Sequence, residues 1–217
     1  MSVEHSHEHV NTRRGYDSSR RKERSRDTHN ALLDAALLRF VQQGYSATTI
    51  DSIALDADVS SATIYKTYGG KSGLVRALCK RALAGRGPVP AEQRSDGLQL
   101  NAADPRLVIE GWGRLAAEVA PRIVPLLLLL RDAADGDPAA ADLYAELDAD
   151  RYNRMAHNAS YLVDGGHTRA GIRRSEAGDV LWTYSSPELY DLLVLRRGWS
   201  LRRYGRFIAE SVVNSLL

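Results

Sequence analysis

Three dipeptides in the second half of the chain fix where helices begin, because each pairs a helix-capping side chain with a proline. They are Asp104-Pro105, Asp137-Pro138 and Ser186-Pro187. The Asp or Ser oxygen accepts a hydrogen bond from a free N–H of the first helical turn, where the missing N–H of proline costs nothing. No stretch of the chain alternates apolar and polar residues as a half-buried strand would. The chain is therefore predicted to be all-α.

Apolar periodicity and breaking residues give the approximate bounds of the helices. The first is expected from about Asp27 to Gly44, with Leu33, Leu37 and Phe40 on one face. Shorter helices are predicted over 50–56, over 61–65 and from Lys71 to near Leu83, followed by a loop or linker over 86–103. Further helices are predicted at about 104–119, 122–133, 138–164, 175–185, 187–197 and 201–216, with Pro121 and Pro125 as breaks.

Charge is distributed unevenly along the chain. Residues 1–86 carry 14 Lys and Arg against 9 Asp and Glu, whereas the remainder carries 15 against 18. A basic front on an acidic body indicates a polyanionic partner for the front, although chance could also produce the imbalance. Residues 1–25 contain too little apolar surface to order themselves and are predicted to form a disordered polar tail.

Several classes of protein are disfavoured by composition. The longest apolar run, over 123–130, is too short to cross a bilayer and contains Pro125. The N-terminus has no apolar segment of the signal-peptide kind. Cys79 is the single cysteine, so an intramolecular disulfide is excluded. We expect a cytoplasmic protein without a membrane partner.

The segment DADVS, residues 56–60, separates two predicted helices that follow a longer supporting helix. This is the pattern of a helix-turn-helix, in which the second helix lies in the DNA major groove. Thr63 is expected to address base edges, and Tyr65 and Lys66 to reach phosphates or a base. The full set of predicted DNA-binding residues is Thr48, Thr49, Ser60, Ser61, Ala62, Thr63, Tyr65, Lys66, Tyr68 and Lys71. The alternative is a generic helical hairpin with a solvated polar face.

Residues 30–78 also resemble the DNA-binding domain of the TetR family of transcriptional regulators. The resemblance is carried by Gly44-Tyr45, Ala47-Thr48-Thr49-Ile50, Ile53-Ala54, Val59-Ser60, Thr63-Ile64-Tyr65, Tyr68 and Lys71. The chain departs from the family pattern at Gly69-Gly70 and at Ala57-Asp58, where Asp58 is expected to adopt a positive φ.

The resemblance implies three regions: a tail over 1–25, a helix-turn-helix domain over 26–86, and a helical domain for ligand binding and dimerisation over 87–217. It further implies an Ω-shaped homodimer that binds a palindromic DNA operator. A small-molecule effector would change the spacing of the two DNA-reading heads, and repression is more frequent than activation in such proteins.

The last two predicted helices carry the apolar residues expected at the dimer interface. These are Leu189, Leu192, Leu193, Leu201, Tyr204, Gly205, Ile208, Ala209, Val212 and Leu216. Gly205 and Ala209 would let two helices approach closely. The alternative is that this stripe packs within one protomer.

Aromatic and polar residues between these regions are candidates for a ligand pocket, which needs apolar walls and a few hydrogen-bonding groups. They are Trp112, Tyr144, Tyr152, Met155, His157, Asn158, Tyr161, Trp182 and Tyr184. The alternative for any one of them is a place in the core with its polar atoms satisfied.

Three rival functions stay open at this point. His5, His7 and His9 could hold a metal ion in a metal-responsive regulator, and His157, Asp164 and His167 could serve acid–base chemistry in an enzyme. An architectural DNA-binding protein without effector is the third. No phosphate-binding loop or nucleophile motif accompanies the histidines, and Cys79 is expected to be a buried inert thiol. We therefore predict a regulator rather than an enzyme, without a cofactor.

Overall fold

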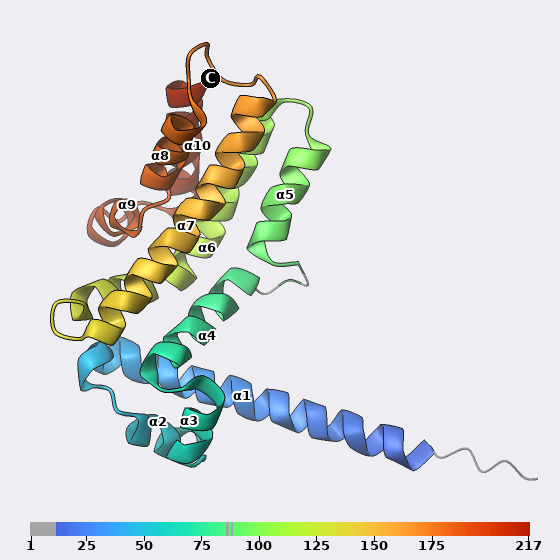
Figure 1. The fold of residues 1–217 in the computed structure, drawn as a ribbon, viewed down its shortest axis with the longest axis vertical. Coiled ribbons are helices and arrows are strands. Elements are labelled where there is room, and N and C mark those ends of the chain that lie inside the picture. The colour runs from blue at the N-terminus through green and yellow to red at the C-terminus, as the bar shows by residue number, and fades with distance from the viewer. Residues whose placement is uncertain (1–11, 86, 88) are drawn as a thin grey trace, which may run out of the picture.

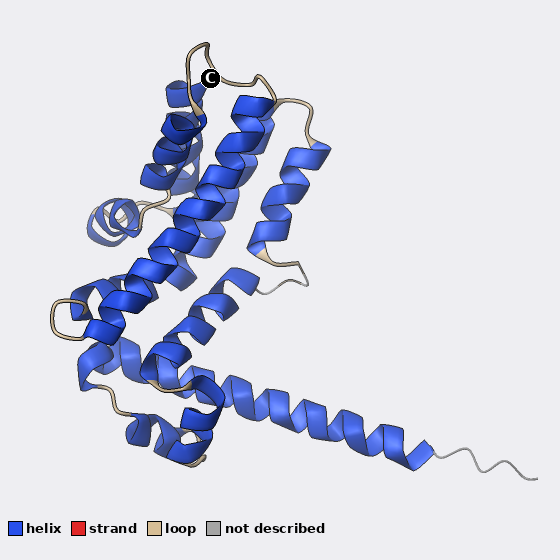
Figure 2. Cartoon of the chain, in the orientation of Figure 1, coloured by secondary structure: helices blue, strands red, loops and turns tan. Residues whose placement is uncertain are grey.

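The computed structural model describes residues 12–85, 87 and 89–217, and within these residues every regular element is a helix (Figure 2). The elements are α1 (Thr12–Ala47), α2 (Ile50–Asp56), α3 (Ser61–Tyr68), α4 (Lys71–Ala84), α5 (Ala91–Asn101), α6 (Pro105–Ala133), α7 (Pro138–Asp164), α8 (Arg174–Tyr184), α9 (Pro187–Tyr190), a π-helical segment η1 (Asp191–Arg196) and α10 (Leu201–Leu216). The prediction of an all-α fold is confirmed. Among the described residues, none of the helices is long and apolar enough to cross a membrane.

Helices α1 to α4 pack around one apolar core at one end of the molecule (Figure 1). Phe40 of α1, Ile53 of α2, Ile64 of α3 and Leu74 of α4 are all fully buried in it. The same cluster continues into Leu126 and Leu130 of α6 and Leu143 of α7. The small N-terminal unit therefore shares its core with the adjacent ends of α6 and α7.

The body is built around α6, which contacts α1, α4, α5, α7, α9 and α10. The crossing of α6 and α10 is very close, since a Cβ atom added to Gly205 would lie 2.5 Å from the carbonyl oxygen of Gly113. Two further apolar clusters lie along this crossing, one with Ile109 and Val212 and one with Val124 and Tyr204. Both capped starts predicted at Asp104 and Asp137 are present, with each carboxylate accepting from N–H groups of the first turn.

Two predicted interruptions are absent, and these predictions were wrong. Residues 105–133 form one helix that passes through Pro121 and Pro125, although each proline removes a backbone N–H. The burial of Ala120, Val124 and Leu126 against surrounding helices offsets this local penalty. Likewise, the region expected as a linker over 86–103 contains α5.

The first helix begins at Thr12 rather than near Asp27, so the prediction of a disordered tail does not hold for 12–25. Arg, Lys and Glu dominate this stretch, and all three are good helix formers. Extension of an existing helix also costs far less than nucleation of a new one. Gly44 interrupts α1 as expected, with φ 80° and ψ 170°.

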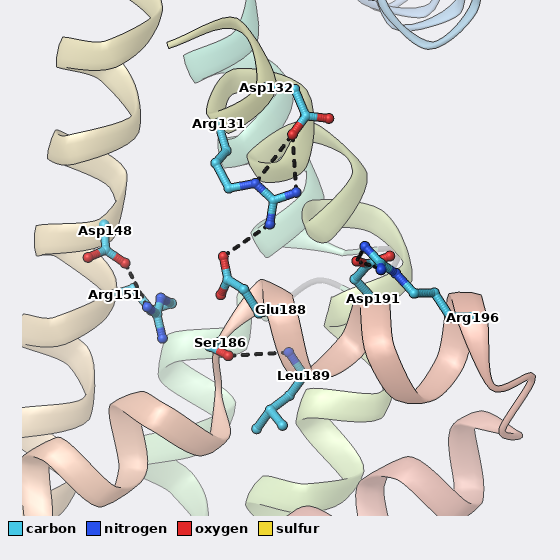
Figure 3. Close-up of polar contacts among 9 residues, drawn as sticks. All are labelled: Arg131, Asp132, Asp148, Arg151, Ser186, Glu188, Leu189, Asp191 and Arg196. Atoms are coloured by element: carbon cyan, nitrogen blue, oxygen red, sulfur yellow. Dashed lines mark hydrogen bonds and ion pairs between the residues drawn. The ribbon is translucent and has the colours of Figure 1, made fainter. Parts of the chain in front are cut away.

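The segment after α8 is held by a polar contact from α6 (Figure 3). Arg131 of α6 donates to Glu188 at 3.3 Å, and Ser186 caps α9 by accepting from the Leu189 N–H. The predicted helix over 187–197 is therefore present, but it changes from α9 to π-helical geometry at Asp191.

Candidate nucleic-acid interface

The sequence of α3 explains why it is short and rigid. The Ser60 hydroxyl caps its start by accepting from the Thr63 N–H at 3.2 Å, and Gly69 ends it in the left-handed conformation. Ile64 points into the core and is completely buried. Ala62, Thr63, Tyr65 and Lys66 are exposed on the rest of the helix. The residues predicted to read DNA therefore form a solvent-facing surface on a helix anchored from behind.

The turn between α2 and α3 has the predicted geometry. Asp58 has φ 51°, a left-handed conformation that Asp tolerates better than most residues. The Val59 N–H donates to the Ala54 carbonyl at 3.0 Å and closes the turn. Arg39 of α1 fixes the end of α2 through a bidentate pair with Asp56, and this hydrogen bond lowers the pKa of the Asp56 carboxyl.

Local hydrogen bonds already orient the hydroxyl groups on the exposed surface of α3. The Ser60 and Thr63 hydroxyl oxygens lie 2.8 Å apart, and the Ser61 hydroxyl donates to the Asp51 carboxylate at 2.5 Å. Asp51, which is exposed on the first turn of α2, was not among the residues predicted from the sequence. It places a negative charge beside a surface expected to meet phosphates. Its position in the first helical turn after the cap Thr49 could have indicated from the sequence that it lies at this surface.

Thr48 requires a correction, because its side chain does not reach the surface. The residue is 1% exposed, and its hydroxyl donates to the carbonyls of Gly44 at 2.7 Å and Arg39 at 3.2 Å. These two contacts join Thr48 to the helix on the near side of the break at Gly44, so Thr48 stabilises the break. Thr49 is exposed and caps α2 by accepting from the Ser52 N–H.

Tyr68 and Lys71 lie at the junction of α3 and α4. The Tyr68 hydroxyl lies 2.7 Å from Nδ1 of His29, and burial raises the pKa of Tyr68. The Lys71 ammonium donates to the Tyr45 carbonyl at 3.1 Å and lies 4.6 Å from the centre of the Tyr45 ring. Lys71 therefore ties α4 to the end of α1, and a phosphate would have to compete with these internal acceptors. Gly70 provides no side-chain cap, which leaves N–H groups of α4 available to an anion.

The predicted ligand-pocket residues do not surround one cavity. Tyr144 packs against the core of the N-terminal unit, whereas Tyr161 lies in the second apolar cluster. The two are 17 residues apart on α7, about 25 Å along the helix axis. A hollow of about 400 Å³ opens beside α8 and α10, and Tyr184 is the one predicted residue among those that line it. The prediction of a single pocket formed by all nine residues was wrong.

The nine residues instead form several separate groups. Edge-on ring contacts pair Trp112 with Tyr161 and Tyr152 with Trp182, and Met155 packs in the second cluster. Asn158 is buried and accepts from Ser95, Gln99 and Arg154 in a polar seam between α5 and α7. The indole N–H groups of Trp112 and Trp182 are buried without an acceptor. These two donors are polar groups that a ligand oxygen or a water could satisfy.

Most of the predicted dimer interface lies inside the protomer, so that prediction was wrong for those residues. Six of these residues are buried in the single protomer: Tyr204, Gly205, Ile208, Ala209, Val212 and Leu216. They pack against α6 because Gly113 and Gly205 allow the two helices to touch. Leu189 and Leu193 are half-buried against the third cluster. Leu192 and Leu201 stay exposed.

The residues that could have served acid–base catalysis or metal binding do not form a common site among the described residues. His157 lies 3.3 Å from Asp96, Asp164 pairs with Arg174, and His167 packs against the Tyr161 ring. His5, His7 and His9 lie outside the described residues, and within the described part of the chain no cluster of metal-ligating side chains occurs. Cys79 is buried as expected, and burial raises the pKa of its thiol to about 12.

The buried supporting helices, the tight turn and the exposed α3 have the arrangement of a helix-turn-helix, a motif whose second helix enters the DNA major groove in many proteins. Residues 32–78 match the sequence profile described as bacterial regulatory proteins, tetR family. This part of the chain is therefore similar to the DNA-binding domain of the TetR family, as its resemblance implied.

Curated relatives match over the same region. The HTH-type transcriptional regulator YvkB of Bacillus subtilis is 41% identical over 71 residues, which are 33% of this chain and 38% of YvkB. YdeS of the same organism is 38% identical over 73 residues, or 34% of this chain and 37% of YdeS. The alignments thus span less than half the length of these relatives.

Solved structures extend the likeness to the whole fold. The fatty acid degradation regulator FadR from Bacillus halodurans is 15% identical, with a TM-score of 0.69 over 87% of this chain and 100% of FadR. A complex of SmeT with triclosan is 18% identical, with a TM-score of 0.67 over 88% of this chain and 92% of SmeT. At such low identity the likeness concerns the fold alone.

Proposed function

We propose that this protein is a ligand-responsive transcriptional regulator, most simply a repressor, that binds a palindromic DNA operator as a homodimer. The exposed surface of α3, with Thr63, Tyr65 and Lys66 over the buried Ile64, is the observation that carries the proposal. Helix α3 is a short helix with an exposed polar face, as a helix that enters the major groove has, and it lies within the residues that match the TetR profile.

Fluorescence anisotropy with a duplex selected by the protein from a randomised pool tests this function. Lys66→Ala should weaken binding to all sequences and lower the slope of log K against log[salt] by about 0.9, the value of one phosphate contact. Thr63→Ala should reduce discrimination between bases by about 1–3 kcal/mol. Lys80→Ala is the matched control, because Lys80 is an exposed lysine nine residues further along α4 than Lys71. Equal effects of Lys66→Ala and Lys80→Ala would refute the assignment of α3.

The proposed dimer interface is the outer surface of α8 and α10. These helices contact each other, and the hollow beside them is lined by Glu176 and Asp179 of α8. Arg202, Arg203 and Arg206 are exposed on α10. A two-fold axis that brings Glu176 and Asp179 of one protomer against these arginines of its partner would favour association. Sedimentation equilibrium of Arg203→Glu, expected to yield monomers, tests this interface against Arg106→Glu on α6.

The body supplies the proposed effector site between α5, α6 and α7. Support comes from the buried Trp112 N–H without acceptor and from the polar seam around Asn158 and Arg154. SmeT has been solved with triclosan, a small molecule, which agrees with a ligand-binding body in a related fold. Replacement of Trp112 by Phe keeps the ring bulk and removes the donor. It should lower effector affinity without changing DNA affinity in the absence of effector.

A further inference from the structure

The N-terminal half of α1 extends far beyond the helices on which α1 packs. The helix begins at Thr12, and Leu32 is the first of its described side chains to be buried. Residues 12–28 therefore span about 25 Å of helix ahead of the core at 1.5 Å per residue. In Figure 1 this part of α1 projects clear of the other helices, and its N-terminal end lies level with α2 and α3.

The projecting helix is strongly basic. Residues 12–26 carry seven Lys and Arg against two Asp and Glu. The whole chain carries 29 against 27, so the rest of the chain taken together carries 22 against 25 and is net acidic. A net charge of about +5 over 15 residues is a local positive field that attracts a polyanion.

The projection starts beside the helix that reads DNA. His29 stacks on Tyr68, the last residue of α3, with ring centres 5.5 Å apart. From there, residues 12–26 reach about 20 Å, or about six base pairs at 3.4 Å per pair. DNA seated on α3 therefore passes within reach of the basic helix.

We propose that residues 12–26 of α1 bind the phosphate backbone of the DNA that flanks the site read by α3. The inference rests on the DNA binding proposed above. Each chain of a homodimer carries one such helix, so the protected region extends beyond both half-sites. Phosphate contacts of this kind add affinity and strong salt dependence but no sequence preference.

The test compares the full-length protein with the double variant Arg20→Gln and Arg21→Gln, since Gln preserves helix propensity. Arg106→Gln with Arg114→Gln is the matched control, because both arginines are exposed on α6. Two probes are used: the duplex selected above, trimmed to the sequence that α3 requires, and the same duplex lengthened by about ten base pairs on each side. Circular dichroism verifies that every variant keeps its helical content.

The wild type and the control are expected to bind the long probe at least tenfold more tightly than the trimmed probe. The Arg20/Arg21 variant should lose most of this difference, and its salt slope on the long probe should fall by about 0.9 for each phosphate that is no longer neutralised. Equal affinities and slopes for variant and wild type would overturn the inference while leaving the function of α3 intact. A change in oligomeric state without a change in salt slope would also overturn it, because the helix would then bind another copy of the chain. Failure of the folded wild type to bind either probe would refute DNA binding itself.

Discussion

The close crossing of α6 and α10 makes Gly205→Ala the most decisive single substitution. The added Cβ would lie 2.5 Å from the Gly113 oxygen and 3.0 Å from the Ala117 Cβ. Non-bonded carbon contacts relax only near 3.5–4.0 Å, so the two helices would have to separate by about 1 Å. Overpacking against backbone costs about 3 kcal/mol, and the better helix propensity of Ala returns about 1 kcal/mol. The expected net loss is about 2 kcal/mol in the free energy of unfolding.

Thermal and urea unfolding followed by circular dichroism measure this loss. For a chain of this size, 2 kcal/mol corresponds to a fall of about 4–8 °C in Tm. Gly97→Ala in α5 is the control, because its Cβ would meet its nearest neighbour, Asn101, at an ordinary 3.9 Å. That change should stabilise the protein by about 0.5–1 kcal/mol.

The same experiment separates packing within a protomer from packing between protomers. If α10 packs on α6 of its own chain, the loss caused by Gly205→Ala is the same at low and high protein concentration. If Gly205 lay at the dimer interface, as predicted from the sequence, the loss would vary with concentration. A neutral or stabilising Gly205→Ala would refute the close crossing altogether.

Three other perturbations have outcomes that the structure predicts. Asp51→Asn should tighten binding to non-specific DNA by roughly two- to fivefold in low salt, the effect of one exposed charge, as measured by anisotropy. Asp58→Gly should keep or slightly raise Tm, whereas Asp58→Val should cost about 1–2 kcal/mol, because a β-branched residue is strained at φ 51°. The hydrogen bond from Arg94 lowers the pKa of Glu118, so the stability it contributes is present above the ordinary pKa and is lost as the pH falls through the lowered value. The difference in the free energy of unfolding between wild type and Glu118→Gln should therefore shrink below about pH 4.

The helix-turn-helix could be predicted from the sequence because local chemistry determines it. The cap Ser60, the terminating Gly69 and the buried Ile64 act within a few residues of each other. The positive φ of Asp58 also follows from the length of the turn and the residues around it. The same locality explains why the capped starts at Asp104 and Asp137 were predicted correctly.

Only the tertiary structure determined which helix each apolar face packs against. The stripe on α10 shows that something covers Ile208 and Val212, but a stripe does not distinguish α6 of the same chain from a second copy. Likewise, Pro121 and Pro125 predict a break in the helix because a proline inside a helix costs a backbone hydrogen bond. The burial of apolar side chains around α6 outweighs this cost, and only the tertiary structure shows it. Helix periodicity is a property of neighbouring residues, whereas partner choice depends on contacts between residues far apart in the chain.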